Sequence, residues 1–331
     1  MTRVGIVGLG MAVGPHAKSL VDLKDRVEVA YAFSPSAERR AAFSAKFPFP
    51  TCERFSAILQ DRSVDAVLLL TPPNTHLEIV ERCADAGKHV LLEKPLEVST
   101  AKAEKLVRVM REAKRKLGIV LQHRFRPAVE KLDALVKAGE LGTLVSASAL
   151  VPVWRPQKGY YDQPGRGTRA RDGGGVLLTQ GIHTLDVYLS LAGEPAAAKS
   201  FWTTTAVHEM ETEDLVAAAV KFKSGALGVV HATTAAYPGF AERIELLGTQ
   251  GTAVLEGTAM KAFLHDGRSL ELKTESGGGG TGADPMAFPH DWHRGVLADF
   301  LDAIEKDREP RVSGEEALKV HRFIDSLLRT P

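Results

Sequence analysis

The first 122 residues alternate short apolar runs, rich in Val, Leu and Ile, with longer stretches that are apolar on one side only. Nearly continuous apolar runs are typical of parallel strands covered on both faces, and one-sided stretches are typical of surface helices. The predicted strands are Val4–Val7, Val27–Ala32, Ala66–Leu70, His89–Leu92 and Ile119–Leu121, and the predicted helices are Pro15–Leu23, Ala37–Phe47, His76–Ala86 and Thr100–Leu117. This order indicates right-handed crossovers and a doubly wound parallel sheet.

Residues at the expected helix ends support this interpretation. Ser99 precedes Thr100–Leu117 and is a candidate N-cap, because its hydroxyl can accept a backbone N–H of the first turn. Gly87 and Gly118 each follow a predicted helix, where a residue in the left-handed conformation would end it.

After Phe125 the pattern changes to alternating segments rich in Thr and Val, which predict a mostly antiparallel sheet. The predicted strands are Leu144–Val153, Ser200–Val207, Leu215–Phe222, Leu227–Ala235, Glu242–Leu247 and Ala253–Glu256. The predicted helices are Pro127–Ala138, Gly175–Leu191, Trp292–Asp307 and Gly314–Leu328, and Gly277–Gly280 is expected to lie in a flexible loop. We therefore predict two domains, a Rossmann-like α/β domain over residues 1–122 and an α+β domain over residues 123–331. The closing helices, residues 292–328, can pack back on the first domain.

Charge and cysteine content exclude several classes of protein. Lys and Arg total 42 against 41 Asp and Glu, so the net charge is +1, without the basic excess of a nucleic-acid binder. No stretch approaches the roughly 18 apolar residues of a membrane-spanning helix. Cys52 and Cys83 are the only cysteines, too few for a disulfide scaffold. Because residues 1–10 lack the order of a signal peptide, a cytoplasmic protein is expected.

Two glycines follow the first predicted strand. Gly8-Leu9-Gly10 lies between a strand and a helix, the context of a dinucleotide-binding loop. Gly8 permits a tight turn, and Gly10 lets the backbone approach a pyrophosphate, with Met11 and Ala12 leading into the helix. The third position of the fingerprint is Val13, so a purely structural turn is the alternative.

The end of the second strand bears on the choice of cofactor. NAD enzymes place a carboxylate there to bind the ribose hydroxyls, but this region reads Ala32-Phe33-Ser34-Pro35-Ser36. Ser34 could bond a 2′-phosphate and Arg39 or Arg40 could approach it, although both arginines could equally be solvated helix residues. NADP is therefore favoured over NAD.

Two further segments carry candidate catalytic residues. Glu93-Lys94-Pro95 follows the strand His89–Leu92, and a lysine at the carboxyl end of a core strand can stabilise an alkoxide. In helical spacing Thr179, His183 and Asp186 share a face, where His183 could act as general base. The alternatives are a surface lysine paired with Glu93 and a structural histidine.

The segment before Gly173-Gly174-Gly175 is rich in aromatic residues and arginines. Trp154 and Tyr161 could stack on a sugar ring, and Arg166 could bind a carboxylate or phosphate, which suits a sugar acid or nucleotide sugar. The alternative is that the tyrosines pack beneath the loop. No metal site is expected, since the spacing of His290, Asp291 and His293 favours helix capping and surface exposure.

Taken together, the motifs resemble one family, the Gfo/Idh/MocA oxidoreductases, which include glucose–fructose oxidoreductase and inositol dehydrogenase. The resemblance spans essentially the whole chain. It rests on Gly8-Leu9-Gly10, Thr71-Pro72-Pro73-Asn74-Thr75-His76, Glu93-Lys94-Pro95, Gln122-His123-Arg124-Phe125, Gly173-Gly174-Gly175 with His183-Thr184-Leu185-Asp186, and the closing Phe300–Ile304 and Ser313–Ala317.

The resemblance implies NAD(P)-dependent hydride transfer to or from a secondary hydroxyl or carbonyl of a sugar, sugar acid, nucleotide sugar or cyclitol. Lys94 would contact the reacting oxygen and His183 would be the acid–base. On the nucleotide side it places Thr71, Pro72, Asn74, His76, Glu93, Lys94 and Gln122, and on the substrate side Arg124, Trp154, Tyr161, Arg166, Thr179 and His183. The open sheet of the second domain would carry contacts of a homo-dimer or homo-tetramer.

One position departs from the family pattern. Many members have an aspartate four residues before the histidine, where this chain has Thr179, and a threonine cannot exchange protons at neutral pH. Two other functions therefore stay open, a non-catalytic NAD(P)-binding regulatory protein and a glycoside-cleaving enzyme that oxidises its substrate transiently.

Overall fold

The computed structural model describes residues 1–273, 281–282 and 288–329. The chain divides into two compact units, Met1–Gln122 with Pro289–Leu318, and His123–Phe288 with Lys319–Pro331. Gly277–Gly280, the glycines of the predicted flexible loop, lie outside the described residues.

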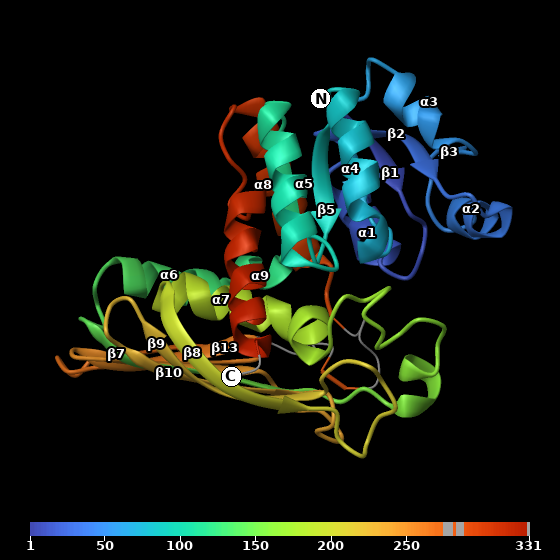
Figure 1. Ribbon diagram of the computed structural model, residues 1–331. Coiled ribbons are helices and arrows are strands. Elements are labelled where there is room, and N and C mark those ends of the chain that lie inside the picture. The colour runs from blue at the N-terminus through green and yellow to red at the C-terminus, as the bar shows by residue number, and fades with distance from the viewer. Residues whose placement is uncertain (274–280, 283–287, 330–331) are drawn as a thin grey trace. The chain divides into compact units, whose positions relative to one another are not determined.

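The first unit is built on a six-stranded sheet (Figure 1) with the order β3-β2-β1-β4-β5-β6. All its neighbouring strands are parallel. The strands are β1 (Thr2–Val7), β2 (Val27–Phe33), β3 (Thr51–Cys52), β4 (Ala66–Leu69), β5 (His89–Glu93) and β6 (Leu117–Val120). This is the strand order of a Rossmann sheet, and it confirms the predicted class of the N-terminal fold.

Six α-helices and one short 3₁₀ turn belong wholly to this unit among its described residues. They are α1 (Val13–Asp22), α2 (Ala37–Ser44), α3 (Phe55–Gln60), α4 (His76–Asp85), α5 (Thr100–Glu112), α8 (Asp291–Glu305) and the turn η1 (Pro73–Thr75). The sequence did not predict β3 or α3, which are too short to show a clear period.

The prediction that Gly118 ends a helix is wrong. Helix α5 ends at Glu112, the positive φ (54°) is taken by Lys114, and Gly118 lies inside β6. A Cβ atom on Gly118 would stand 2.9 Å from Cδ2 of Phe300, so the glycine permits α8 to pack closely on β6. The caps at Ser99, which accepts the N–H of Lys102, and at Gly87, with φ of 67°, are confirmed.

The second unit contains an eight-stranded sheet with the order β14-β13-β12-β11-β7-β10-β9-β8. Its strands are β7 (Leu144–Pro152), β8 (Pro195–Thr203), β9 (Leu215–Phe222), β10 (Leu227–Thr233), β11 (Arg243–Gly248), β12 (Gly251–Glu256), β13 (Ala259–Leu264) and β14 (Ser269–Leu272). Among these strands β7 and β10 pair in parallel, and the other neighbours are antiparallel. The predicted mostly antiparallel sheet is confirmed, although β8 begins earlier than predicted and β13 and β14 were not predicted.

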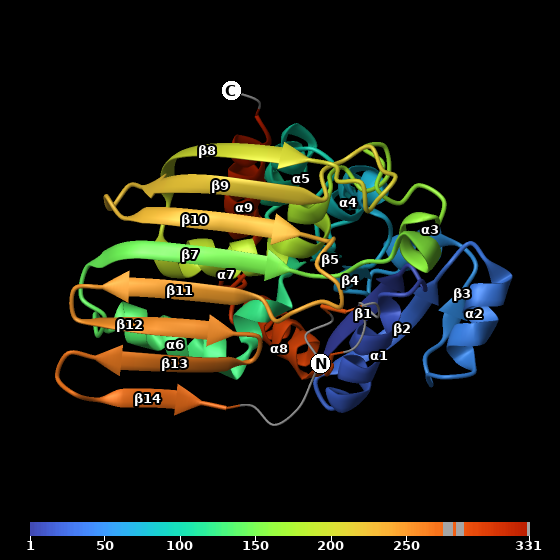
Figure 2. The ribbon, with the colours of Figure 1, turned by 90° about the horizontal axis from the view of Figure 1, so that it is seen from below.

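Helices cover one face of this sheet. Helices α6 (Pro127–Lys137) and α7 (Ile182–Ala192) and the second-unit part of α9 (Gly314–Leu328) lie behind it in Figure 2. Three short turns complete the unit or join it to the first: η2 (Gln122–Phe125) and the π-helical η3 (Gln157–Tyr161) and η4 (Leu177–Gly181). In β9, residues therefore alternate between a buried face and an exposed one, with Val216, Ala218 and Val220 buried.

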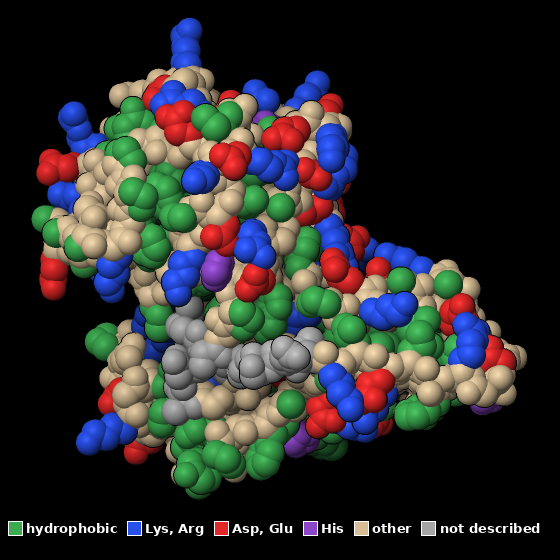
Figure 3. All heavy atoms as spheres, turned by 180° about the vertical axis from the view of Figure 1, so that it is seen from behind, with side chains coloured by type: hydrophobic (Ala, Val, Ile, Leu, Met, Phe, Trp, Pro, Cys, Tyr) green, Lys and Arg blue, Asp and Glu red, His purple; other side chains and the backbone are tan. Residues whose placement is uncertain are grey.

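The surface is mixed in charge. Lys and Arg side chains are interspersed with Asp and Glu over the face seen in Figure 3, as expected for a net charge of +1. Among the helices of the described residues, none combines the length and the apolar character needed to cross a membrane.

The buried His321 of α9 makes the stability of the protein depend on pH. Burial lowers the pKa of its imidazole to about 4, whereas the unfolded chain keeps a pKa of about 6.5. Between these values the unfolded state binds more protons, so stability falls as the pH falls through this window. We measure the free energy of unfolding in urea at pH 7 and at pH 5. Between these pH values it should fall by about 2 kcal/mol more in the wild type than in His321→Leu. His265→Leu, at an exposed site, should behave as the wild type, and equal losses in all three proteins would contradict the prediction.

Candidate active site

The turn after β1 is shaped by a close backbone approach. Gly8 has φ of 104°, and a Cβ atom on it would stand 2.8 Å from the carbonyl carbon and oxygen of Leu70. At Gly10, in contrast, no atom lies within 4 Å of the position that a Cβ would take. Gly8 is thus required by the packing of β1 beside β4, while Gly10 leaves open space at the start of α1. A pyrophosphate fits this combination of space and helix N-terminus.

The two arginines that follow β2, Arg39 and Arg40, differ in their contacts. Ser36 caps α2 by accepting the N–H of Arg39, and the hydroxyl oxygen of Ser34 accepts the N–H of Ser36 at 3.3 Å. Arg40 donates to the carbonyl oxygen of Ser34 at 2.8 Å and pairs with Glu53 at 3.1 Å. The exposed side chain of Arg39 forms no ion pair within the described part of the chain.

The loop after β4 is fixed to the turn after β5 by a histidine. Pro72 and Asn74 are exposed, whereas His76 is wholly buried. The Nε2 atom of His76 lies 2.8 Å from the carbonyl oxygen of Thr71, and its Nδ1 atom lies 3.1 Å from that of Pro95. His76 therefore joins the two loops from a buried position.

The carboxylate of Glu93 organises the turn that carries Lys94. One oxygen of Glu93 accepts the backbone N–H of Lys94 at 3.0 Å, and the other lies 2.9 Å from Nε2 of His16. Burial opposes ionisation of Glu93, but the hydrogen bond with His16 and the charge of Lys94 outweigh it, so the pKa of Glu93 is lowered. The Lys94–Pro95 peptide bond is cis.

Gln122 provides a second sign that a ligand belongs in the first unit. Its side chain is buried, and its Oε1 atom accepts no hydrogen bond from the described residues. A buried acceptor without a donor is costly, and a hydroxyl or amide of a nucleotide could supply that donor.

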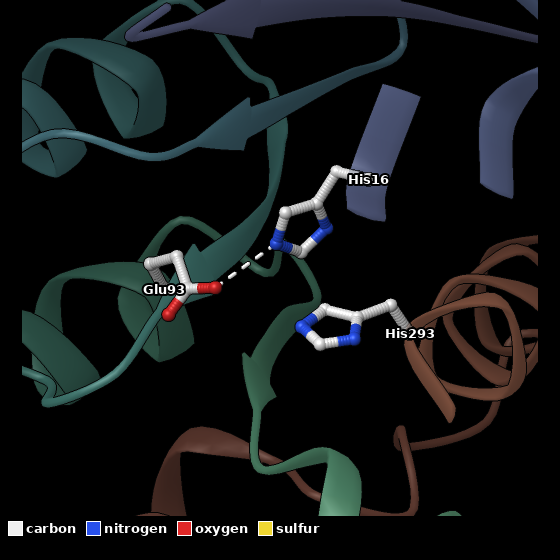
Figure 4. Close-up of side chains that lie close together, drawn as sticks. All are labelled: His16, Glu93 and His293. Carbon is white, nitrogen blue, oxygen red and sulfur yellow. Dashed lines mark hydrogen bonds and ion pairs between the residues drawn. The ribbon is translucent and has the colours of Figure 1, made fainter. Parts of the chain in front are cut away.

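His293 is not the exposed capping residue that the sequence predicted. It is 3% exposed, and its ring meets that of His16 edge-on, with centroids 4.9 Å apart (Figure 4). His293 shares the helical spacing of the buried Val296 and Phe300, so it lies on the packed face of α8. Burial, reinforced by His16, lowers the pKa of His293 to about 3. His290 is the more exposed histidine of the pair and lies 2.9 Å from Asp22.

In the second unit, a buried glutamate sets the start of the helix that carries His183. The carboxylate of Glu213 accepts the N–H of Gly175 at 3.1 Å and that of Leu177 at 3.3 Å. A Cβ on Gly175 would overlap the backbone oxygen of Glu213 at 1.8 Å, so this position requires glycine. The segment predicted as one helix, Gly175–Leu191, contains a π-helical turn, Leu177–Gly181, followed by α7.

This division changes the predicted spacing between Thr179 and His183. Thr179 lies in the π-helical turn and donates its hydroxyl to the carbonyl oxygen of Gly175 at 2.6 Å. The three residues Thr179, His183 and Asp186 thus do not lie along one regular α-helix, as the sequence predicted.

A bidentate ion pair links Arg124 to α7, the helix that carries His183. Two N–H groups of Arg124 donate to the two carboxylate oxygens of Asp186, each at 2.7 Å, and Asp186 is 1% exposed. The ring of His183 is buried against that of His123, with centroids 4.7 Å apart. Arg124, predicted to contact substrate, thus orients Asp186 through its guanidinium.

The aromatic loop brings further predicted residues close to Thr179. Gln180, the neighbour of Thr179, donates its amide N–H to the hydroxyl of Tyr160 at 2.7 Å. The guanidinium of Arg166 lies 4.9 Å from the ring centroid of Tyr160. Tyr161 is buried beneath the loop and donates its hydroxyl to Thr234 at 3.1 Å. Thr179, Gln180, Tyr160 and Arg166 therefore form one group, whereas Tyr161 supports it from below.

Sequence reasoning missed one histidine that supports this loop. Nδ1 of His208 lies 2.7 Å from Asp214, and its Nε2 lies 2.8 Å from the carbonyl oxygen of Arg155. Trp154 is half-buried, and its ring lies 6.1 Å from that of His208. No local motif connects His208 with this loop, so only the fold reveals its role.

Comparisons with known proteins agree with these features. Residues 2–120 match the model of an oxidoreductase family with an NAD-binding Rossmann fold, and residues 129–254 match the GFO/IDH/MocA C-terminal domain. The chain is 27% identical to a myo-inositol 2-dehydrogenase of Thermotoga maritima, over 95% of this chain and 91% of that protein. It is 26% identical to an inositol 2-dehydrogenase of Rhizobium meliloti, over 99% of this chain and 96% of that protein.

A solved structure shows the same fold. The WlbA dehydrogenase of Bordetella pertussis, in complex with NADH and UDP-GlcNAcA, superposes with a TM-score of 0.83 and 25% identity, covering 98% of this chain and 94% of that one. The fold and the nucleotide loop define an NAD(P)-dependent oxidoreductase acting on CH–OH groups. The chain belongs to the Gfo/Idh/MocA family.

Proposed function

We propose that the protein transfers hydride between nicotinamide and a secondary hydroxyl or carbonyl of a sugar, sugar acid, nucleotide sugar or cyclitol. The features that carry this proposal are the nucleotide loop and the partly buried Glu93-Lys94 turn of the first unit, together with the buried His183 of the second unit. Two relatives are named for inositols, and one structural neighbour holds a nucleotide sugar acid. We expect the enzyme to act in the cytoplasm.

The dinucleotide, when bound, supplies the hydride acceptor or donor. Lys94 contacts the reacting oxygen and stabilises negative charge on it, with its backbone held by the carboxylate of Glu93. His183 takes the hydroxyl proton during oxidation and returns it during reduction. Thr179 cannot replace the aspartate of other members as a proton carrier. Its hydroxyl hydrogen is donated to the carbonyl oxygen of Gly175, so its role is to accept a hydrogen bond from the substrate.

The group around Tyr160 suits an anionic, sugar-like substrate. Arg166 is half-buried, lies over an aromatic ring and reaches Asp172 only at 3.8 Å, so its guanidinium can turn to a carboxylate or phosphate. Trp154 and Thr179 supply further contacts to the substrate. Tyr161, being buried, holds the loop that presents them.

The cofactor preference is tested by fluorescence titration with NADPH and NADH, after mass spectrometry has shown that no nucleotide copurifies. We expect tighter binding of NADPH, because no carboxylate follows β2 and Arg39 is available. Arg39→Ala should weaken NADPH binding about tenfold and leave NADH binding within twofold, since one charged hydrogen bond to phosphate is lost. Arg62→Ala, which removes an exposed arginine before β4, is the matched control. Tighter binding of NADH by the wild type would overturn the preference for NADP.

The catalytic assignment is tested with a substrate found by screening inositols, aldoses and sugar acids for net formation of reduced cofactor. We expect Lys94→Ala and His183→Ala each to lower kcat by about 100-fold or more, with nucleotide affinity within a few-fold, because each removes an acid–base or charge-stabilising group. Lys24→Ala and His265→Ala, at exposed sites, are the controls. Full turnover in both test variants would contradict the assignment.

The same screen separates the alternatives. Substrate turnover without net release of reduced cofactor would favour transient oxidation. Nucleotide binding without any turnover would favour a regulatory protein.

We further propose that the uncovered face of the eight-stranded sheet joins copies of this chain into a homo-dimer or homo-tetramer. The strand register places large, exposed apolar side chains on that one face, where such a patch is typical of an interface. They are Leu150, Phe201, Leu227, Val229, Leu247 and Phe263.

Sedimentation velocity tests this interface. Val229→Glu should shift the wild-type oligomer towards monomer, because it places a charge within the apolar face, where Val229 is 50% exposed. Val21→Glu, at an exposed apolar position on α1, should leave the distribution unchanged. A wild-type protein that sediments as a monomer would contradict the proposal.

A further inference from the structure

Three side chains able to ligate a metal ion converge inside the first unit. His16 comes from α1, Glu93 from the end of β5 and His293 from α8. One ligand atom of each lies within 4.8 Å of those of the other two. Figure 4 shows the carboxylate facing His16, with His293 beside them. Segments far apart in the sequence thus bring two imidazoles and one carboxylate to one point.

The donor set has the chemistry of a transition-metal site. Two imidazole nitrogens and one carboxylate oxygen are the ligands of many three-residue zinc sites, in which water or a ligand takes the fourth position. His16 and His293 are 1% and 3% exposed, so water competes weakly for their nitrogens. Their rings are nearly perpendicular, with an interplanar angle of 88°, so they approach the carboxylate from different directions.

We propose that His16, Glu93 and His293 form a binding site for Zn²⁺ or a similar late first-row divalent ion. Zn²⁺ bonds of about 2.0–2.2 Å in a tetrahedron place ligand atoms about 3.4 Å apart. The observed separation is 2.9 Å between His16 and Glu93 and at most 4.8 Å within the group, so side-chain movements of about an ångström complete the site. The ion takes the place of the hydrogen bond between His16 and Glu93.

One neighbouring charge opposes the ion. Lys94 acts electrostatically on both Glu93 and His293, so its ammonium repels a bound cation. The negative carboxylate of Glu93 offsets that repulsion. This balance leads to a specific expectation, that removing the charge of Lys94 tightens metal binding.

The experiment is a titration of the full chain with Co²⁺ as probe, after treatment with a chelator and followed by visible d–d absorption. We expect one saturable equivalent, displaced by Zn²⁺, and a melting temperature raised by Zn²⁺ because the ion binds the folded state. His16→Gln, Glu93→Gln and His293→Gln should each weaken binding at least about tenfold, because each removes a ligand. Lys94→Met should tighten it.

His290→Gln is the matched control. His290 lies at the same end of α8 as His293, is more exposed and pairs with Asp22. It should leave the Co²⁺ affinity unchanged. Circular dichroism without metal establishes which variants fold, and any one folded ligand variant suffices for the test. Absence of saturable binding to the wild type would overturn the proposal. If binding is lost in His290→Gln but kept in His293→Gln, the ion binds at His290 and Asp22 instead, and the proposal is overturned as well.

Discussion

The hydrogen bonding of one partly buried carboxylate, that of Glu93, constrains much of the first unit. A carboxylate withdrawn from water must have its lone pairs satisfied, and here the partners are the imidazole of His16 and the N–H of Lys94. These partners belong to the helix after the phosphate loop and to the turn that carries the proposed catalytic lysine. The hydrogen bonds of this one carboxylate therefore fix α1 relative to the end of β5. His76 adds a second connection, between that turn and the loop after β4.

The second unit also contains buried acidic groups whose oxygens accept hydrogen bonds. Asp186 is held by both arms of the Arg124 guanidinium, and Glu213 accepts two backbone N–H groups at the start of the His183 helix. In each case an acidic group orders the segment next to a predicted functional residue. Rigid support of this kind keeps an acid–base group in position through turnover.

Sequence reasoning succeeded where local pattern and tertiary packing agree. Strand β4 and the centre of β5 are apolar because both faces are covered, so the positions of these strands follow from composition within about a residue. Gly118 shows where local pattern is not enough. A glycine can end a helix or leave room for a neighbouring ring, and only the position of Phe300 in the fold distinguishes these two roles. The π-helical turn at Thr179 begins where Glu213, distant in the sequence, accepts the N–H groups of Gly175 and Leu177, and local spacing does not reveal that contact. For His293 the signal was present in its helical register with Val296 and Phe300, but its neighbours His290 and Asp291 suggested a surface segment.

The composition of the first unit bears on how the chain acquires its structure. Helix α8 packs on α1, β5 and β6, yet its residues are separated from them in the sequence by nearly all of the second unit. A ribosome releasing the chain from the N-terminus delivers the six strands of the Rossmann sheet long before their last covering helix. Until His123–Phe288 has been made, the sheet lacks Phe300 against Gly118 and His293 against His16. The N-terminal sequence can therefore form its strands early during synthesis, but it completes its packing only when translation is nearly finished.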